Sequence, residues 1–348
     1  MHFQRESIFV SGVRCFCNAL AVVFGAVIAV VVAMMVIGML SGPNMTPEKS
    51  EMQIAADADG NRTLLSHTAP VILKLDIHGI IGEGDLTYEK IQNLLLDSRE
   101  DLLSNNRVKA ILLHVNTPGG VATDADNIYR AIEAYKKKYN VPVYAFVDGL
   151  CASGGMYIGA AADKIYATST STIGSIGVIL GPAFNFSGAM EKIGIQSMTI
   201  SQGKDKDMLN PFRPWKPGED QSLCAITKDL YDQFVNIVVA ARPNLDKTKL
   251  IEEYGAQVYL AAQAQQLGYI DVAGSSYALA LKDLVAAAQL PEGHPYQVVT
   301  LQTPHSFLAD LAQGRSPITT GKVTHHLHMG SAYSSELSGK MLYLYLPQ

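Results

Sequence analysis

A run of 26 residues without a charged side chain, from Cys15 to Leu40, most constrains how this 348-residue chain can fold. As a helix this run would be roughly 39 Å long, which exceeds the ~30 Å hydrocarbon thickness of a bilayer. A secretory signal has a shorter apolar region followed by a small-residue cleavage site. The sequence therefore predicts an uncleaved transmembrane helix over residues 15–40.

The charges on the two sides of this run predict its orientation. Arg5 and Arg14 precede it, whereas Glu48, Glu51 and Asp57 follow it. The flank of a membrane span that carries more lysine and arginine stays on the cytoplasmic side. We therefore expect residues 1–14 in the cytoplasm and the remainder of the chain on the extracytoplasmic side.

Composition excludes several classes of ligand. The net charge is −5, and the chain has no basic block or basic-aromatic interleaving, so we expect no nucleic-acid partner. Its four cysteines have neither the spacing of a metal site nor that of a disulfide framework. The histidines form no metalloprotease motif. We predict no metal and no cofactor.

Beyond the apolar run, the hydrophobic pattern divides the chain into three parts. Residues 41–69 are polar and without a clear period, which indicates a linker. Residues 70–290 alternate short apolar strands with amphipathic helices, as in α/β proteins with a largely parallel sheet and flanking helices. The pattern weakens over residues 291–348, which we interpret as a C-terminal extension of unknown role. Strands are expected at 71–81, 108–115, 141–147, 165–168, 176–179 and 198–201, and helices at 86–103, 122–139, 184–193 and 219–241.

Two glycine-rich turns follow neighbouring strands of the predicted sheet. One is Asn116–Gly120, and the other is Ser153–Gly155. Sites usually form at the carboxyl ends of parallel strands. Ser153 lies between a strand and the start of a helix, where a hydroxyl is free of regular structure and backbone N–H groups are unpaired. These features suit a nucleophile, although the usual role of an isolated serine before a helix is to cap it.

A serine nucleophile needs a base. No histidine occurs between His114 and His294, so a histidine base would have to come from an apolar strand or from the extension. A desolvated lysine is the other option. Lys206, with Lys204 beside it, is the candidate, and the alternative is an ordinary solvated loop.

Six motifs in a fixed order connect the chain to a known family. They are NTPGG (116–120), ASGG (152–155), AAADKIYA (160–167), TIGSIGV (172–178), GKDKD with PFRP (203–214) and AQQLGYID (264–271). In this combination the chain resembles the bacterial signal peptide peptidase A family of serine proteases and the related SohB-type proteases. The resemblance covers about residues 70–290.

The resemblance implies a Ser-Lys dyad. Ser153 would be the nucleophile, Lys206 the general base, and Ser175 the residue whose hydroxyl orients the lysine. Glycine lets backbone donors approach a substrate carbonyl, and preorganised donors stabilise the developing oxyanion. The oxyanion-hole donors would be the N–H groups of Gly119, Gly120 and Gly154.

The same resemblance implies the remaining properties. The core would be crotonase- or Clp-protease-like, and the protein would assemble into a homo-oligomeric ring, commonly an octamer. It would be an endopeptidase of remnant signal peptides or other short hydrophobic or unfolded peptides, held in the cytoplasmic (inner) membrane by one helix. Two departures from the family pattern flank the nucleophile, because Cys151 replaces a small residue and Met156 replaces a tyrosine.

Three alternatives follow from the same residues. Cys151 offers a thiol as a competing nucleophile. The chain could instead be a catalytically silent membrane-anchored scaffold, which the presence of Ser153 and Lys206 argues against. A crotonase-like acyl-CoA enzyme would also use paired glycine loops, but such enzymes carry pocket carboxylates and would find little CoA outside the cytoplasm.

Overall fold

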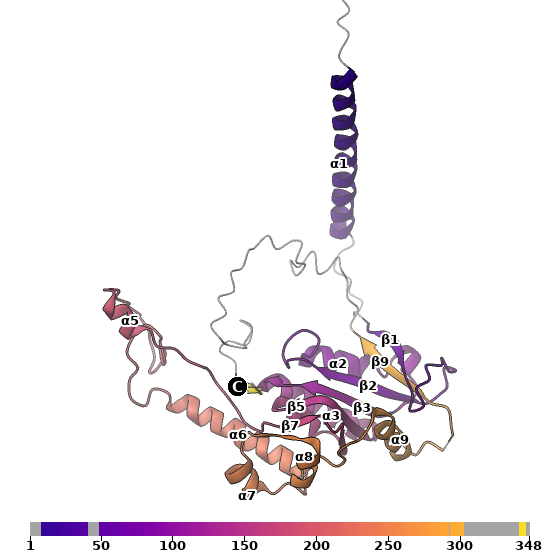
Figure 1. The fold of residues 1–348 in the computed structure, drawn as a ribbon, viewed down its shortest axis with the longest axis vertical. Coiled ribbons are helices and arrows are strands. Elements are labelled where there is room, and N and C mark those ends of the chain that lie inside the picture. The colour runs from indigo at the N-terminus through magenta and orange to yellow at the C-terminus, as the bar shows by residue number, and fades with distance from the viewer. Residues whose placement is uncertain (1–7, 41–48, 292, 303–340, 346–348) are drawn as a thin grey trace, which may run out of the picture. The chain divides into compact units, whose positions relative to one another are not determined.

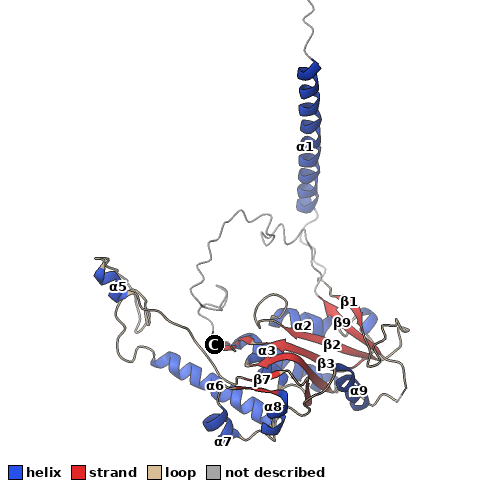
Figure 2. Cartoon of the chain, viewed as in Figure 1, coloured by secondary structure: helices blue, strands red, loops and turns tan. Residues whose placement is uncertain are grey.

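The computed structural model describes residues 8–40, 49–291, 293–302 and 341–345, which belong to two compact units, Met1–Glu48 and Lys49–Gln348. In the first unit, α1 (Ile8–Leu40) contains the segment Ser11–Ala33, which is long and apolar enough to cross a membrane. The second unit is built around a sheet (Figures 1 and 2).

The central sheet of the second unit is largely parallel. Its order is β1-β9-β2-β3-β5-β7-β8, with β6 paired to β5. The strands are β1 (Glu51–Ala55), β2 (Val71–His78), β3 (Val108–Thr117), β5 (Val143–Ala152), β6 (Lys164–Ala167), β7 (Thr172–Gly174), β8 (Val258–Leu260) and β9 (Gln297–Gln302). Only the β1–β9 and β7–β8 pairs in this sheet are antiparallel. The predicted α/β class is confirmed.

Helices cover both faces of this sheet because successive strand residues point to opposite sides. Ile111 and Leu113 of β3 pack in the larger apolar cluster, together with residues of α2, α3, α4 and α6. Leu112 belongs to a second cluster, which includes Leu281 and Leu284 of α9. The helices are α2 (Tyr88–Asp97), α3 (Ala122–Tyr139), α4 (Gly154–Gly159), α5 (Ser187–Lys192), α6 (Gln221–Ala241), α7 (Lys247–Lys249), α8 (Ala261–Leu267) and α9 (Tyr277–Ala287).

Helix α3 shows how local sequence sets these boundaries. Its bounds coincide with the predicted helix at 122–139. The helix ends because Asn140 adopts the left-handed conformation (φ 50°), and asparagine tolerates this conformation better than most residues. Three lysines lie in its last turn, where their positive charges interact favourably with the negative end of the helix dipole.

The sheet extends beyond residues 70–290 at both ends. Strand β1 comes from the segment predicted as a linker, and β9 comes from the segment predicted as an extension. Strand β9 lies between β1 and β2 and runs parallel to β2, with Val299 opposite Leu73. Because Val298 and Val299 are each 1% exposed, the sheet gains apolar burial from this strand.

Residues 181–218 form a segment that we call the arm, which carries α5 away from the sheet (Figure 1). None of its residues is buried. The predicted strand at 198–201 is wrong, since these residues belong to no strand and lie exposed in the arm. The strand predicted at 176–179 is displaced, because the regular strand in this region is β7, which ends at Gly174. Ile179 makes an isolated bridge with Leu342.

Candidate active site

Ser153 lies at the turn between β5 and α4 and has an unusual backbone. Its φ and ψ are 53° and −116°, outside the regions that L-residues favour, and it is 1% exposed. The Ser153 N–H donates to the carbonyl of Gly174 at 2.8 Å, which fixes the turn against β7. The Ser153 side chain makes no hydrogen bond that caps α4. Such strain persists only where the surrounding structure imposes it, and it clusters at functional sites.

The glycine-rich turn after β3 lies against this serine turn. A Cβ atom on Gly119 would lie 2.7 Å from the Gly154 nitrogen, so only glycine permits this approach. The φ of Gly119 is +94°, which also favours glycine. The Gly119 N–H donates to Thr117 Oγ1 at 3.1 Å, so among the three predicted oxyanion donors this one is already engaged by the protein. Gly120 and Gly154 remain as candidate donors.

A short strand near the end of the chain lies beside these glycines, in the space between residues 119–121 and Ile179 that we call the groove. Strand β10 (Leu342–Leu344) pairs antiparallel with β4 (Gly119–Val121), and Tyr343 faces Gly120. On its other side, Leu342 exchanges two backbone hydrogen bonds with Ile179, each 3.0 Å long. Sequence reasoning assigned this segment no role, although its apolar sequence MLYLYL was a usable signal.

Ser175 lies close to the serine turn. It follows Gly174, whose carbonyl accepts the Ser153 N–H, and its own N–H donates to the Gln257 carbonyl at 2.8 Å. Ser175 is 6% exposed and has a φ of 53°, so its backbone is constrained like that of Ser153. The structure therefore brings Ser153, Ser175 and the glycine turn together.

Lys206 lies elsewhere, in the exposed arm. Its backbone N–H donates to the Gly203 carbonyl at 3.3 Å, and among the described residues no hydrogen bond joins the exposed Lys206 to the buried Ser153. The neighbouring Asp207 carboxylate pairs with Arg213 at 2.9 Å, and this pairing lowers the pKa of Asp207. The described single chain therefore leaves Lys206 and Ser153 apart.

Cys151 lies at the buried end of β5. It is fully buried, and its Sγ is 3.6 Å from Met156 Sδ. Burial raises the pKa of the Cys151 thiol to about 12. Because the thiolate is the nucleophilic form, this cysteine is inert near neutral pH.

This burial predicts the response to thiol reagents. In folded protein, iodoacetamide should alkylate the exposed Cys224 but not Cys151, and activity measured on the Cys224→Ser variant should survive the reagent. Peptide mapping by mass spectrometry reports both sites. Modification of Cys151 in the folded protein together with lost activity would contradict the serine assignment.

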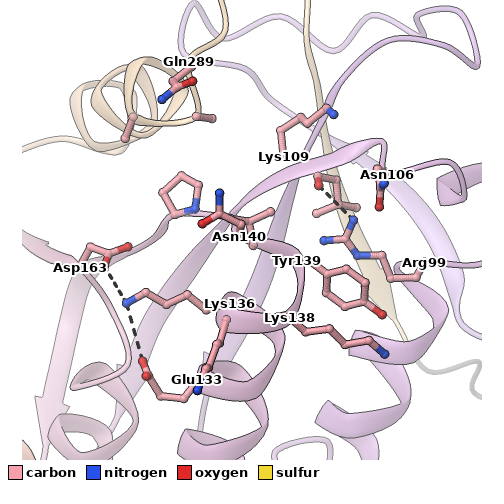
Figure 3. Close-up of a pocket in the computed structure, with 16 residues that line it drawn as sticks. Arg99, Asn106, Lys109, Glu133, Lys136, Lys138, Tyr139, Asn140, Asp163 and Gln289 are labelled. Atoms are coloured by element: carbon pink, nitrogen blue, oxygen red, sulfur yellow. Dashed lines mark hydrogen bonds and ion pairs between the residues drawn. The ribbon is translucent and has the colours of Figure 1, made fainter.

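Two other clusters on the second unit lie away from Ser153. A hollow beside the end of α3 carries several basic side chains, but Lys136 pairs with Asp163 at 2.6 Å and with Glu133 at 3.7 Å (Figure 3). None of the predicted site residues lines this hollow. In a second cluster, both ring nitrogens of His114 contact carboxylates, at 3.2 Å (Asp76) and 2.7 Å (Asp148).

Comparison with known proteins decides the family. The sequence profile of Peptidase family S49 matches residues 135–289. A Synechocystis relative, provisionally named protease slr0021, is 32% identical over 208 residues, which are 60% of this chain and 71% of the relative. The chain belongs to peptidase family S49.

One further relative and one solved structure are also similar to this chain. An Enterococcus faecium protein, provisionally named signal peptide peptidase SppA, is 35% identical over 210 residues. That alignment covers 59% of this chain and 60% of the relative. Among solved structures, a mutant of ClpP1 from Listeria monocytogenes matches with a TM-score of 0.38 and 17% identity, over 59% of this chain and 92% of that one. The family profile and the Enterococcus faecium relative together confirm the likeness to the signal peptide peptidase A family.

Proposed function

We propose that this S49 protein is a membrane-anchored serine endopeptidase with a Ser-Lys dyad. Ser153 Oγ attacks the substrate carbonyl carbon, and Lys206 accepts the serine proton and returns it to the leaving amine. The N–H groups of Gly120 and Gly154 stabilise the oxyanion. Gly119 contributes by having no side chain, which leaves the groove open, and Ser175 orients the lysine.

The observation that carries this proposal is the geometry around Ser153. A buried serine with a strained backbone lies beside two glycine turns, and the carbonyl oxygen of Tyr343 reaches the space between them. That oxygen lies 1.9 Å from the position of a Cβ on Gly119 and 3.1 Å from the position of one on Gly154. The groove thus holds a peptide carbonyl beside Gly154, the residue that follows the predicted nucleophile, and this supports the proposal.

The separation of Lys206 from Ser153 supports a dyad completed between protomers. The arm that carries Lys206 exposes large apolar side chains, such as Met198 at 86%, Ile200 at 84% and Phe184 at 55%. Exposed apolar patches of this kind mark interaction sites. We therefore propose that the arm packs on a neighbouring copy in a homo-oligomeric ring and delivers Lys206 to the neighbour's Ser153.

Mixing two inactive variants tests this arrangement. Ser153→Ala and Lys206→Ala subunits should each be inactive alone, whereas co-expressed subunits should recover roughly a quarter of wild-type activity, because random mixing in a ring leaves that share of interfaces intact. Activity would be measured on an unfolded protein after co-purification through two different tags. No recovery in a verified mixed oligomer would place the dyad within one chain.

The groove and the anchor support the substrate class. A peptide that pairs with β4 and Ile179 is held through its main chain, which tolerates varied sequences. Together with an N-terminal apolar helix and relatives named signal peptide peptidase, this favours remnant signal peptides and other hydrophobic or unfolded peptides at the extracytoplasmic face of the cytoplasmic membrane. A strand-shaped groove does not favour the acyl-CoA alternative.

The proposal as a whole is tested by hydrolysis of an unfolded protein by the full-length chain in detergent. Wild type should cleave it at internal bonds, and Ser153→Ala should not. Fragment sizes from mass spectrometry distinguish endopeptidase from exopeptidase action. An assembled but inactive wild type would favour the scaffold alternative.

A further inference from the structure

Two imidazole rings and a carboxylate gather at the carboxyl ends of β2 and β3. Asp76 and His78 are alternate residues of β2, and Asp76 lies opposite His114 of β3 in the parallel register. Because alternate residues of a strand point to the same face, all three side chains lie on one side of the sheet. One nitrogen or oxygen from each lies within 4.8 Å of the other two. Imidazole nitrogen and carboxylate oxygen are both ligands that zinc accepts.

The His114 ring is held in position by its neighbours. Its Nε2 lies 2.7 Å from Asp148 Oδ2 on the adjacent strand β5. The ring stacks on Phe146, with centroids 6.0 Å apart, and meets the ring of Tyr277 edge-on at 6.5 Å. A histidine that binds a metal usually donates its second ring N–H to a carboxylate or carbonyl, which fixes its tautomer. Asp148 is placed to be that partner.

The contact between His114 and Asp76 marks a place for a cation. When Nε2 donates to Asp148, the lone pair of Nδ1 faces Asp76 Oδ1 at 3.2 Å. Two acceptors at this distance repel each other unless a positive charge lies between them. That charge is either a proton on Nδ1 or a metal ion. Ligand atoms of a tetrahedral zinc ion are roughly 3.3 Å apart, since each lies about 2.0–2.1 Å from the metal. This pair of atoms therefore already has the separation that zinc requires.

His78 and Lys74 act on this place in opposite directions. The His78 ring centroid lies 4.5 Å from that of His114, and His78 is exposed, so its ring can turn toward the same point. The Lys74 Nζ lies 2.8 Å from Asp76 Oδ1, and its charge repels a second cation. The lysine side chain is flexible and can move away from the carboxylate. Removal of the Lys74 charge should therefore strengthen binding of a cation.

We propose that Asp76, His78 and His114 form a zinc site whose fourth position is open to solvent. Asp148 orients His114 within it. This proposal departs from the absence of a metal expected from the sequence, where the histidines form no metalloprotease motif. The ligands are brought together by the register of β2 and β3. The site lies outside the proposed catalytic dyad and does not depend on the proposed function.

A bound ion would act on the strand ends that support the glycine turn. Thr117 Oγ1 donates to the carbonyl of Gly79, the residue after His78, at 2.5 Å, and accepts the Gly119 N–H at 3.1 Å. A zinc ion that links β2 to β3 therefore holds together the two strands on which this turn rests. Because the ion binds only where these strands are paired, it should raise the unfolding temperature by a few degrees at saturation.

Titration of the full-length protein in detergent with zinc chloride tests the site. His325, His326 and His328 could bind zinc on their own, so every protein carries alanine at these three positions and is purified through a tag without histidine. Isothermal titration calorimetry should then show one zinc ion per chain. Magnesium prefers oxygen ligands and should not compete. Unfolding temperature and hydrolysis of an unfolded protein are measured on the same samples.

Three single variants locate the ion. His78→Ala should weaken zinc binding by roughly 10–100-fold or more and abolish the thermal shift, because it removes an exposed ligand. Lys74→Gln should tighten binding by on the order of 10-fold, because a neighbouring positive charge is lost. The matched control His67→Ala removes an exposed histidine outside the cluster and should leave the Kd unchanged.

Three results would overturn the inference and leave the proposed function standing. The first is no stoichiometric zinc binding, which would assign a proton to His114 Nδ1. The second is an equal Kd in His78→Ala and His67→Ala. The third is binding that Lys74→Gln does not tighten, which would place the ion away from Asp76. Loss of peptide hydrolysis with the zinc results as expected would instead count against the proposed function alone.

Discussion

Lys206→Ala is expected to lower kcat/KM for an unfolded protein by about 10⁴-fold or more, as removal of a catalytic base does in other serine proteases. Lys204→Ala is the matched control, because it removes the same charge two residues away in the same exposed loop. It should retain activity within a few-fold of wild type. The measurement is the initial rate of peptide-bond cleavage, with oligomeric state checked for each variant.

The arm makes this pair of variants informative. No residue of the arm is buried, so neither substitution removes core packing. Full activity in Lys206→Ala with loss in Lys204→Ala would move the base by two residues. Loss in both, with the oligomer intact, would mean that the loop acts through its overall charge, and the assignment of Lys206 as the base would fail.

Much of the fold could be predicted because most residues of its central strands β2, β3 and β5 are buried. Strand β3 and helix α3 have the pattern of a parallel α/β unit, with apolar strands and amphipathic helices in alternation. Strand β9 could not be placed in the same way. It pairs with β2 across more than 200 residues of chain, and the six residues QVVTLQ, half of them polar, carry no information about such a distant partner.

The candidate site could also be predicted from the sequence only in part. Ser153 and the turn at Gly119–Gly120 follow adjacent strands, so topology alone predicts that they meet. The neighbours of Tyr343 and the bond from Gly119 to Thr117 depend on side-chain and register details that no local pattern encodes. Lys206 illustrates a further limit, because its position relative to Ser153 depends on another copy of the chain under the proposed assembly.

Gly119→Ala is expected to reduce kcat/KM by about 10²–10³-fold, the size of effect found when one oxyanion-hole contact is lost. The added methyl group would lie 1.9 Å from the position of the Tyr343 carbonyl oxygen and 2.7 Å from the Gly154 nitrogen. It would therefore both block the bound peptide carbonyl and displace an oxyanion donor. The rate is measured on the unfolded protein, and folding by thermal denaturation.

Gly60→Ala separates this effect from backbone strain. Gly60 has a similar φ of +82°, but no atom lies within 4 Å of its Cβ position. Both variants should lose about 1–3 kcal/mol of stability from an alanine at positive φ, yet only Gly119→Ala should lose activity. Equal activity in the two variants would show that the groove beside Gly119 does not bind the scissile carbonyl, because a methyl group in that position could not be accommodated together with it.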